Sequence, residues 1–183
     1  MSARPKLNVQ NFPRPPLLEQ IPRHLLIRWS GQTLADTRSS FWVLETTHPP
    51  TYYLPRDSIL HDFKLSQAPG RASLCEWKGR ATYWDVTNQS TGETVKGKVW
   101  SYESPTPAFK DIKGYLSFYA NDVPWECFVD DEKVTPQEGD SACPHPTSLL
   151  TFDLTFDTGD YYGGWVTSEL EGPMKGGPGT WGW

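Results

Sequence analysis

Apolar and polar residues alternate with a period of two along most of the chain, which is typical of half-buried β-strands. The alternation is clearest over residues 24–29, 33–38, 40–47 and 94–103. Another alternating segment, residues 75–86, is interrupted at Gly79, where we expect a tight turn or bulge because glycine enters positive φ without strain. Short strands at this spacing predict a mainly β fold of compact tent-like or sandwich antiparallel sheets.

One or two short helices are expected between the strands. Asp57 is a suitable N-cap for a helical turn or two that reaches Phe63. Thr106 and Pro107 open a second helix, which runs to Lys113 and ends at Gly114. Proline favours the first position of a helix and glycine the position after its end, so this second helix has both of its boundaries marked.

The segment 75–86 is expected to fold back on itself as a hairpin. If the turn lies at the central glycine, Tyr83 and Trp84 come back against Trp77 and Lys78. The strand that contains residues 100–102 is next in sequence. Because consecutive strands usually pair, we expect it to be the neighbour of this hairpin in the sheet.

A chain of 183 residues predicts one domain with a sizeable core. Five prolines in residues 1–22 predict a proline-rich N-terminal arm, either loose or laid along the domain. Residues 23–183 are expected to form the single β domain, ending in a Gly/Pro/Trp tail over residues 172–183. Trp181 and Trp183 need a surface that buries them, on their own domain or on a partner, so a homodimer is among the expected states.

Composition excludes several classes of function. The net charge of −5 argues against nucleic-acid binding, which relies on clustered Lys and Arg. No stretch approaches the roughly 20 apolar residues of a membrane span, and residues 1–8 lack the apolar region of a signal peptide, so we expect no membrane association and no secretion. Three widely spaced cysteines indicate free thiols and a cytoplasmic location.

Metal and cofactor sites are not expected. Cys75, Cys127 and Cys143 form no close pair, and His145 lacks the second half of a zinc site. The motifs of common hydrolases, zinc metalloproteases and phosphate-binding loops are absent from the sequence.

Candidate chemistry gathers in the segment 75–86. Cys75 is either a nucleophile activated by a neighbouring cation or a small buried apolar side chain. Lys78 either binds an anionic group or extends along the surface. Gly79 favours the binding role, because it lets a ligand approach the backbone closely.

Glu45 interrupts an otherwise apolar strand face, so it is either paired or functional. Arg38 and Lys78 are the available cationic partners. Two functions follow. The first is an enzyme that acts on an unknown small molecule, with Glu45 as general acid or base. The second is a non-catalytic domain whose aromatic box holds a flat or cationic ligand or a partner protein.

Five motifs in order resemble the domain-of-unknown-function 427 family of bacteria and fungi, which has also carried a nucleotidyltransferase-like label. They are residues 31–38 (GQTLADTR), 43–45 (VLE), 49–55 (PPTYYLP), 75–79 (CEWKG) and 100–105 (WSYESP). The resemblance spans roughly residues 25–134, and the ending, with GGWVT at 163–167, resembles the fungal branch.

The resemblance implies a compact tent-like β fold, related in shape to zinc-binding exchange-factor and methionine-sulfoxide-reductase domains, whose metal-binding Cys pairs this chain lacks. It brings no established reaction, and the carboxylate pair that the nucleotidyltransferase label implies is missing. It implies a pocket, to which we add the neighbouring indole of Trp77. The expected catalytic residues are Glu45, Cys75 and Lys78, and the expected ligand-binding residues are Arg38, Tyr53, Trp77, Tyr83, Trp100 and Tyr102.

The sequence departs from the fungal pattern at residues 141–160, where about twenty extra residues intervene. Long insertions are tolerated in surface loops, so we expect a peripheral insertion there. An unspliced intron in the gene is the alternative origin.

Overall fold

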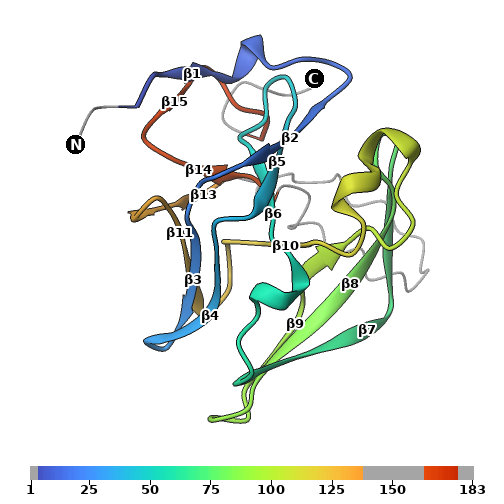
Figure 1. Cartoon of the computed structure of the whole chain (residues 1–183), viewed down its shortest axis with the longest axis vertical. Helices are drawn as coiled ribbons and strands as arrows, with labels where there is room; N and C mark the ends of the chain where they lie inside the picture. The colour runs from blue at the N-terminus through green and yellow to red at the C-terminus, as the bar shows by residue number, and fades with distance from the viewer. Residues whose placement is uncertain (1–3, 138–162, 177–183) are drawn as a thin grey trace, which may run out of the picture.

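The computed structural model describes residues 4–137 and 163–176 (Figure 1). The expected insertion at 141–160, Cys143, His145 and the tail beyond residue 176 lie outside the described residues. The strands are β1 (Leu7–Asn8), β2 (Leu17–Ile21), β3 (Leu25–Trp29), β4 (Gln32–Thr37), β5 (Ser40–Leu44), β6 (Thr51–Tyr53), β7 (Phe63–Cys75), β8 (Gly79–Asn88), β9 (Thr94–Ser101), β10 (Leu116–Phe118), β11 (Trp125–Val129), β12 (Glu132–Lys133), β13 (Thr135–Pro136), β14 (Trp165–Val166) and β15 (Leu170–Glu171). The 3₁₀ helices are η1 (Val9–Asn11), η2 (Arg56–Ser58) and η3 (Pro107–Ile112).

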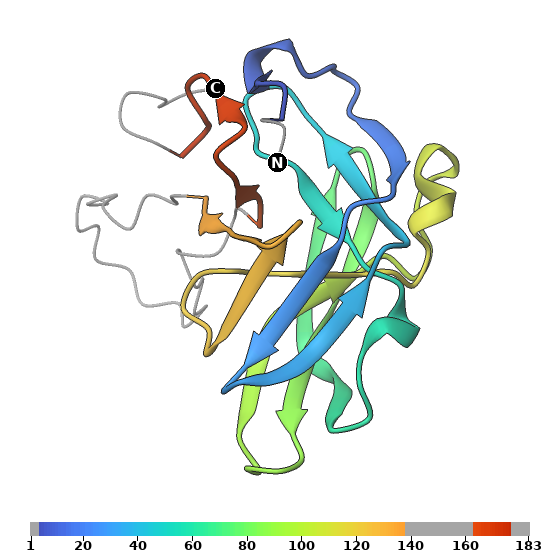
Figure 2. The same ribbon diagram turned by 60° about the vertical axis from the view of Figure 1, so that its left-hand side comes forward.

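Three sheets carry the fold, in the strand orders β10-β9-β8-β7, β12-β11-β3-β4 and β2-β5-β6. All the pairings within them are antiparallel. The first two sheets face each other, and the β2-β5-β6 sheet joins them at one end (Figures 1 and 2). The prediction of a mainly β fold of compact antiparallel sheets with short helices is therefore confirmed. None of the helices in the described part of the chain is long and apolar enough to span a membrane.

The main core lies between the facing sheets and is built from a few large aromatic side chains. The ring of Trp29 stacks on Phe63 at 5.7 Å between centroids and meets Trp125 edge-on at 5.6 Å. The indole N–H of Trp125 donates to the carbonyl of Tyr119 at 2.8 Å, and that of Trp165 donates to the carbonyl of Phe118 at 2.8 Å. Such rings bury much apolar area while their polar atoms stay hydrogen-bonded, as large aromatic cores require.

One helix and one hairpin turn follow from residues that are close together in the sequence. The helix expected from Pro107 is present as η3. The hairpin between β11 and β12 turns at Asp130 and Asp131, which have φ values of 49° and 73°. Two consecutive residues with positive φ match the twist of a two-residue hairpin turn, and Asp tolerates this conformation better than most residues.

The helix expected over residues 57–63 is wrong. Only the three residues of η2 are helical, and Phe63 already begins β7. Ile59 instead forms an isolated antiparallel bridge with Ala35 of β4, and the amide of Leu60 donates to the carbonyl of Leu34 at 2.9 Å. The open edge of β4 thus takes the backbone groups that a helix would need, and this tertiary pairing outweighs the local helical pattern.

The register expected for the hairpin at residues 75–86 is also wrong. Cys75 pairs with Gly79, so Trp77 and Lys78 belong to the connecting turn and have no partner in the ladder. Trp84 lies opposite Gln67 instead. Gly79 has a φ of +98° and ends the turn, which explains why it marks the start of β8. The expected pairing with the next strand is confirmed, since Tyr83 of β8 pairs with Trp100 of β9.

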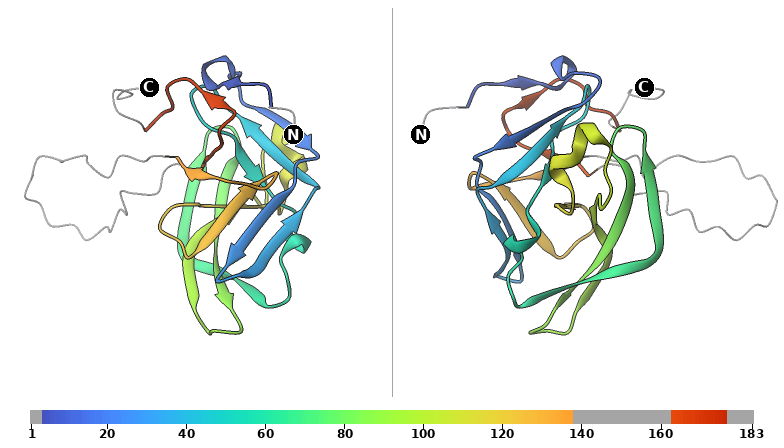
Figure 3. Two further views of the ribbon diagram at one scale, coloured as in Figure 1. Left: turned by 90° about the vertical axis from the view of Figure 1, so that its left-hand side faces the viewer. Right: turned by 45° about the vertical axis from the view of Figure 1, so that its right-hand side comes forward.

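The N-terminal segment lies along the domain. The strand β2 falls inside the range predicted to be an arm, and it pairs with β5 over its whole length. Val9 and Phe12 are buried against Leu44 and Leu170 in a small core of their own. Residues from the two ends of the described chain therefore pack side by side at one end of the molecule (Figure 3).

Candidate functional site

Most of the residues predicted to form a site come together in one cluster of the fold. Tyr53 lies on β6, and the register between β8 and β9 places Tyr83 opposite Trp100. The rings of Tyr53 and Tyr102 are 6.3 Å apart. We call the following set the aromatic cluster: buried Tyr53, Tyr83, Trp100 and Tyr102, with partly buried Cys75 and Trp77 packed against them.

The turn between β7 and β8 delivers Lys78 to the edge of this cluster. The hydroxyl of Thr106 donates to the carbonyl of Trp77 at 2.6 Å, and the amide of Thr106 donates to the carbonyl of Lys78 at 3.2 Å. These bonds fasten the tip of the hairpin to the chain just before η3. These two hydrogen bonds therefore hold the backbone of the turn, and with it the Cα atom of Lys78, in a fixed position.

Lys78 is only 9% exposed, although lysine is almost never buried without a partner. Its Nζ lies 6.0 Å from the centre of the Phe109 ring, a weak cation–π contact. Within residues 4–137 and 163–176, no side chain forms an ion pair or hydrogen bond with this ammonium group. A buried cation without a counter-charge is a natural place for an anionic ligand.

The loop after β5 carries the second ionisable part of the site. We call residues 45–50 the His48 loop. The amide of His48 donates to the carbonyl of Glu45 at 3.0 Å, and the imidazole Nδ1 lies 2.9 Å from the carbonyl of Thr46. Thr47 has a φ of 66°, which is unusual for a β-branched residue and must be sustained by its surroundings.

Several charges meet at His48. Burial lowers the pKa of this imidazole below its ordinary value of 6.5. The ammonium groups of Lys175 and Lys78 lower the pKa further, while the Glu45 carboxylate acts in the opposite direction. His48 is therefore neutral at neutral pH and able to accept a proton. His48 was not predicted as a site residue. Its position between Glu45, at the end of a strand, and the Pro49-Pro50 pair could have suggested it, because it lies in a short loop next to a candidate acid or base.

Two tyrosines of the cluster, Tyr53 and Tyr102, are held in the protonated form. Burial raises the pKa of Tyr53 and of Tyr102, and the nearby Cys75 raises it further in both cases. The hydroxyl of Tyr83 shares a hydrogen bond of 2.9 Å with Ser73. By contrast, the buried indole nitrogen of Trp77 has no hydrogen-bond partner in the described structure, and the buried hydroxyl of Tyr53 has none of good geometry, although the Trp100 and Tyr102 side chains lie close enough to lower its pKa.

Two other predicted features lie elsewhere. Arg38 is exposed in the turn between β4 and β5, and in the described part of the chain it forms no ion pair with Glu45. Cys127 is fully buried in the main core, and burial raises the pKa of its thiol, so it is a packing residue. Among the described residues, no group of three or more His, Cys, Asp or Glu side chains is arranged to hold a metal ion.

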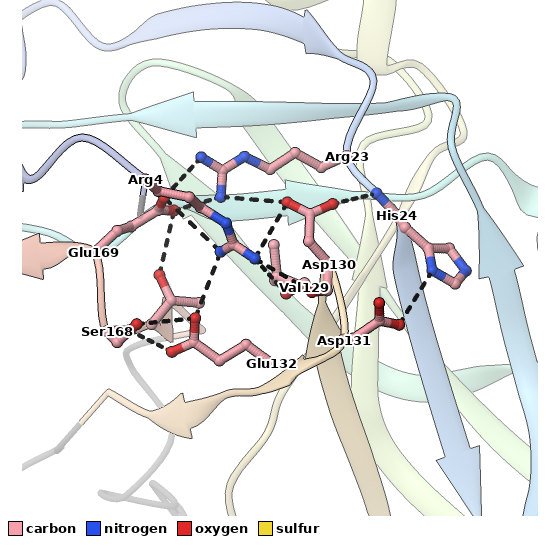
Figure 4. Close-up of polar contacts among 10 residues, drawn as sticks. Arg4, Arg23, His24, Val129, Asp130, Asp131, Glu132, Ser168 and Glu169 are labelled. Carbon is pink, nitrogen blue, oxygen red and sulfur yellow. Dashed lines mark hydrogen bonds and ion pairs between the residues drawn. The ribbon is translucent and has the colours of Figure 1, made fainter. Parts of the chain in front are cut away.

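A second polar constellation, missed by the sequence analysis, lies where the two chain ends meet the β11–β12 turn (Figure 4). Glu169 has a side-chain exposure of 2% and binds the guanidinium of Arg23 through both oxygens, one of them at 3.0 Å from Nη2. Burial alone would lower the pKa of Arg23, but the bond to Glu169 and the surrounding charges raise it. We call this set the charged cluster: Arg4, Arg23, Asp130, Glu132, Ser168 and Glu169.

A comparison with protein families gives one match. The model of a family described as a domain of unknown function (DUF427) matches residues 17–135, about two thirds of the chain. No curated protein matches the chain. All the site residues predicted from the sequence lie inside the matched region, whereas Arg4, Glu169 and Lys175 lie outside it.

Proposed function

Since the chain belongs to the DUF427 family, whose description carries no activity, we propose a function from geometry: the aromatic cluster and Lys78 bind a small molecule with an anionic group and a flat apolar body. Two findings support this proposal: the family membership of the chain and the buried aromatic cluster in its β domain.

The proposal rests mainly on Lys78, a residue only 9% exposed whose ammonium group has no ion pair or hydrogen bond among the described residues. Burial of a charge without a partner is costly, so proteins rarely retain one for stability alone. The hydroxyl of Tyr53, which lacks a hydrogen bond of good geometry, and the unpaired indole N–H of Trp77 belong to the same cluster. Each is a polar group that a bound molecule would satisfy.

The charge of Lys78 favours an anionic ligand over a cationic one. A cation placed over the rings would gain cation–π attraction, but it would meet an ammonium group in a poorly solvated site. The ring faces suit a flat apolar body, since aromatic rings pack against one another in offset or edge-on geometry. A phenyl or similar ring with a carboxylate or phosphate group combines both features.

We also propose acid–base roles at the edge of this site. Neutral His48 suits proton transfer with the bound molecule, and Glu45, beside it in the loop, is the second candidate general acid or base. Half-buried Cys75 is the candidate nucleophile. These titratable groups support an enzyme over a purely aromatic box.

The second candidate function is a non-catalytic domain whose rings hold a flat ligand or a partner side chain. Its support is the density of ring contacts, because Trp100 also packs on Tyr119 at 4.6 Å between centroids. Such a domain would bind without needing Glu45, His48 or Cys75. Binding that survives Glu45→Gln and His48→Gln without any turnover would favour it.

Native mass spectrometry of the purified protein tests the binding proposal. We expect a bound small molecule in the wild type and in Lys64→Met, which changes an exposed lysine on β7. The variant Lys78→Met keeps the apolar stem but removes the charge, so it should lose the molecule. Retention of the same molecule by Lys78→Met would contradict the proposal.

We also propose the branch of the family, the oligomeric state and the cellular location of this protein. The glycine-rich ending around Gly163 and Gly164 supports the fungal branch of the family. A homodimer and a cytoplasmic location are the expected state and place of the protein.

A further inference from the structure

The two ends of the described chain lie next to each other, outside the region that matches the family. β1 and β15 pair in parallel, with Leu7 opposite Leu170 (Figure 1). The amide of Leu7 donates to the carbonyl of Glu169 at 2.9 Å, and Nζ of Lys6 donates to the carbonyl of Ser168 at 2.7 Å. We call residues 4–16 and 163–176 together the terminal strap.

Both halves of the terminal strap bind the His48 loop. From the N-terminal half, the carbonyl of Val9 accepts the amide of Thr47 at 2.9 Å, and the carbonyl of Phe12 accepts the hydroxyl of Thr46 at 2.6 Å. From the C-terminal half, the amide of Lys175 donates to the carbonyl of Thr47 at 2.7 Å. Thr47 is thus held from two sides in its unfavourable backbone conformation.

The C-terminal half also continues past the loop to the aromatic cluster. The amide of Trp165 donates to the carbonyl of Pro50 at 3.2 Å. Gly163 lies so close to Trp100 that a Cβ atom built on it would come within 2.1 Å of the indole. One segment therefore touches both the ionisable loop and the aromatic rings of the site.

The charged cluster fastens the terminal strap to the sheets (Figure 4). Glu169, in the C-terminal half, binds Arg23, which lies in the connection between β2 and β3. Arg4, in the N-terminal half, lies 3.5 Å from Asp130 and 3.5 Å from Glu132, in the β11–β12 hairpin. Because Arg4 is also 3.9 Å from Glu169, the two halves share one ionic centre.

We propose that the terminal strap completes the candidate site by holding the His48 loop in place, and that Glu169 and Arg23 are the positioning residues that anchor the terminal strap. This goes beyond the proposed function, because it assigns a role to segments outside the family region. It concerns the unliganded protein, so its test needs no ligand.

Amide hydrogen exchange and NMR titration of the full chain test the proposal with Glu169→Gln, which removes the charge and keeps the size. We expect roughly tenfold faster exchange at Thr47 and Lys175, with unchanged exchange at Trp100 in β9. The pKa of His48 should rise toward its ordinary value of 6.5, since burial is the first cause of its lowering. The matched control is Glu126→Gln, which removes an exposed carboxylate paired with Lys133 on β11 and β12.

The outcome against the proposal is equally specific. Unchanged exchange at Thr47 together with an unchanged His48 pKa would overturn it, as would an equal increase at Trp100, which reports general destabilisation. If Glu169→Gln does not fold, the same measurements are made on Arg4→Gln. The Arg4 side chain is 28% exposed, so its replacement should destabilise the fold less. Amide exchange at Thr47 should then become faster and the pKa of His48 should rise, each by a smaller amount. If neither changes in Arg4→Gln, the proposal is overturned.

Discussion

The edge of the aromatic cluster and the charged cluster each hold a largely buried charged residue, Lys78 and Glu169, but the two charges are paired in opposite ways. In the charged cluster, the buried carboxylate of Glu169 has Arg23 and Arg4 around it. At the edge of the aromatic cluster, the ammonium group of Lys78 lies 6.0 Å from the centre of the Phe109 ring and has no counter-charge among the described residues. A paired buried charge holds segments in a fixed arrangement, whereas an unpaired one is available to a ligand.

The largest expected effect comes from breaking the charged cluster. Glu169→Ala leaves the guanidinium of Arg23 partly buried without its partner, which should lower the free energy of unfolding by about 3 kcal/mol. Denaturant unfolding measures this loss. The control Glu126→Ala breaks an exposed pair and should cost less than about 1 kcal/mol. Equal losses in the two variants would mean that the buried pair is no more important than a surface pair.

The aromatic cluster should respond in the opposite direction. Lys78→Met replaces an unpaired charge on a largely buried residue by an apolar side chain of similar length, so it should raise the free energy of unfolding by up to about 1 kcal/mol. Lys64→Met on exposed β7 should change it by less than about 0.5 kcal/mol. A clear loss of stability in Lys78→Met would show that the lysine is structural, and the contrast between the clusters would disappear.

A smaller effect is expected from pH at the His48 loop. The pKa of His48 is lowered in the folded protein, so the unfolded chain binds a proton first as the pH falls. Stability should therefore be full above pH 6.5, decline as the pH falls below 6.5, and level off once the folded-state pKa is passed. His48→Gln should lack this part of the decline in unfolding measured across that range. An identical decline in both proteins would assign it to other groups.

The smallest effect separates two tyrosines of the same cluster. Tyr83→Phe loses the hydrogen bond with Ser73 and should cost about 1 kcal/mol. Tyr53→Phe removes a hydroxyl without a hydrogen bond of good geometry, although Trp100 and Tyr102 lie near it, so it should cost less than about 0.5 kcal/mol. Unfolding curves of the two variants show the difference. A larger loss in Tyr53→Phe would mean that its hydroxyl is hydrogen-bonded in solution.

Local patterns predicted much of the fold. The strands and the β11–β12 turn follow from period-two alternation and from turn residues, which depend on neighbours in sequence. The helix at residues 57–63 failed because Ala35, distant in sequence, pairs with Ile59. The hairpin register failed because the pattern did not show that Trp77 and Lys78 form the turn.

The candidate site was predictable where its residues are concentrated in one hairpin and its neighbouring strands. Cys75 and Lys78 were evident from the sequence, and pairing of consecutive strands placed Trp100 opposite Tyr83. The charged cluster could not be found in this way, because Arg23 and Glu169 are separated by 146 positions. No local pattern links residues at that distance, and only the folded chain shows that they meet.

The most direct test of the central claim, that Lys78 and the aromatic cluster bind an anionic compound, is an NMR titration with benzoate. We expect saturable shifts of the Trp77 indole N–H and the Lys78 amide in the wild type, their loss in Lys78→Met, and no such shifts with benzylamine, which carries the opposite charge. Equal shifts in wild type and Lys78→Met, or shifts with benzylamine but not benzoate, would contradict it.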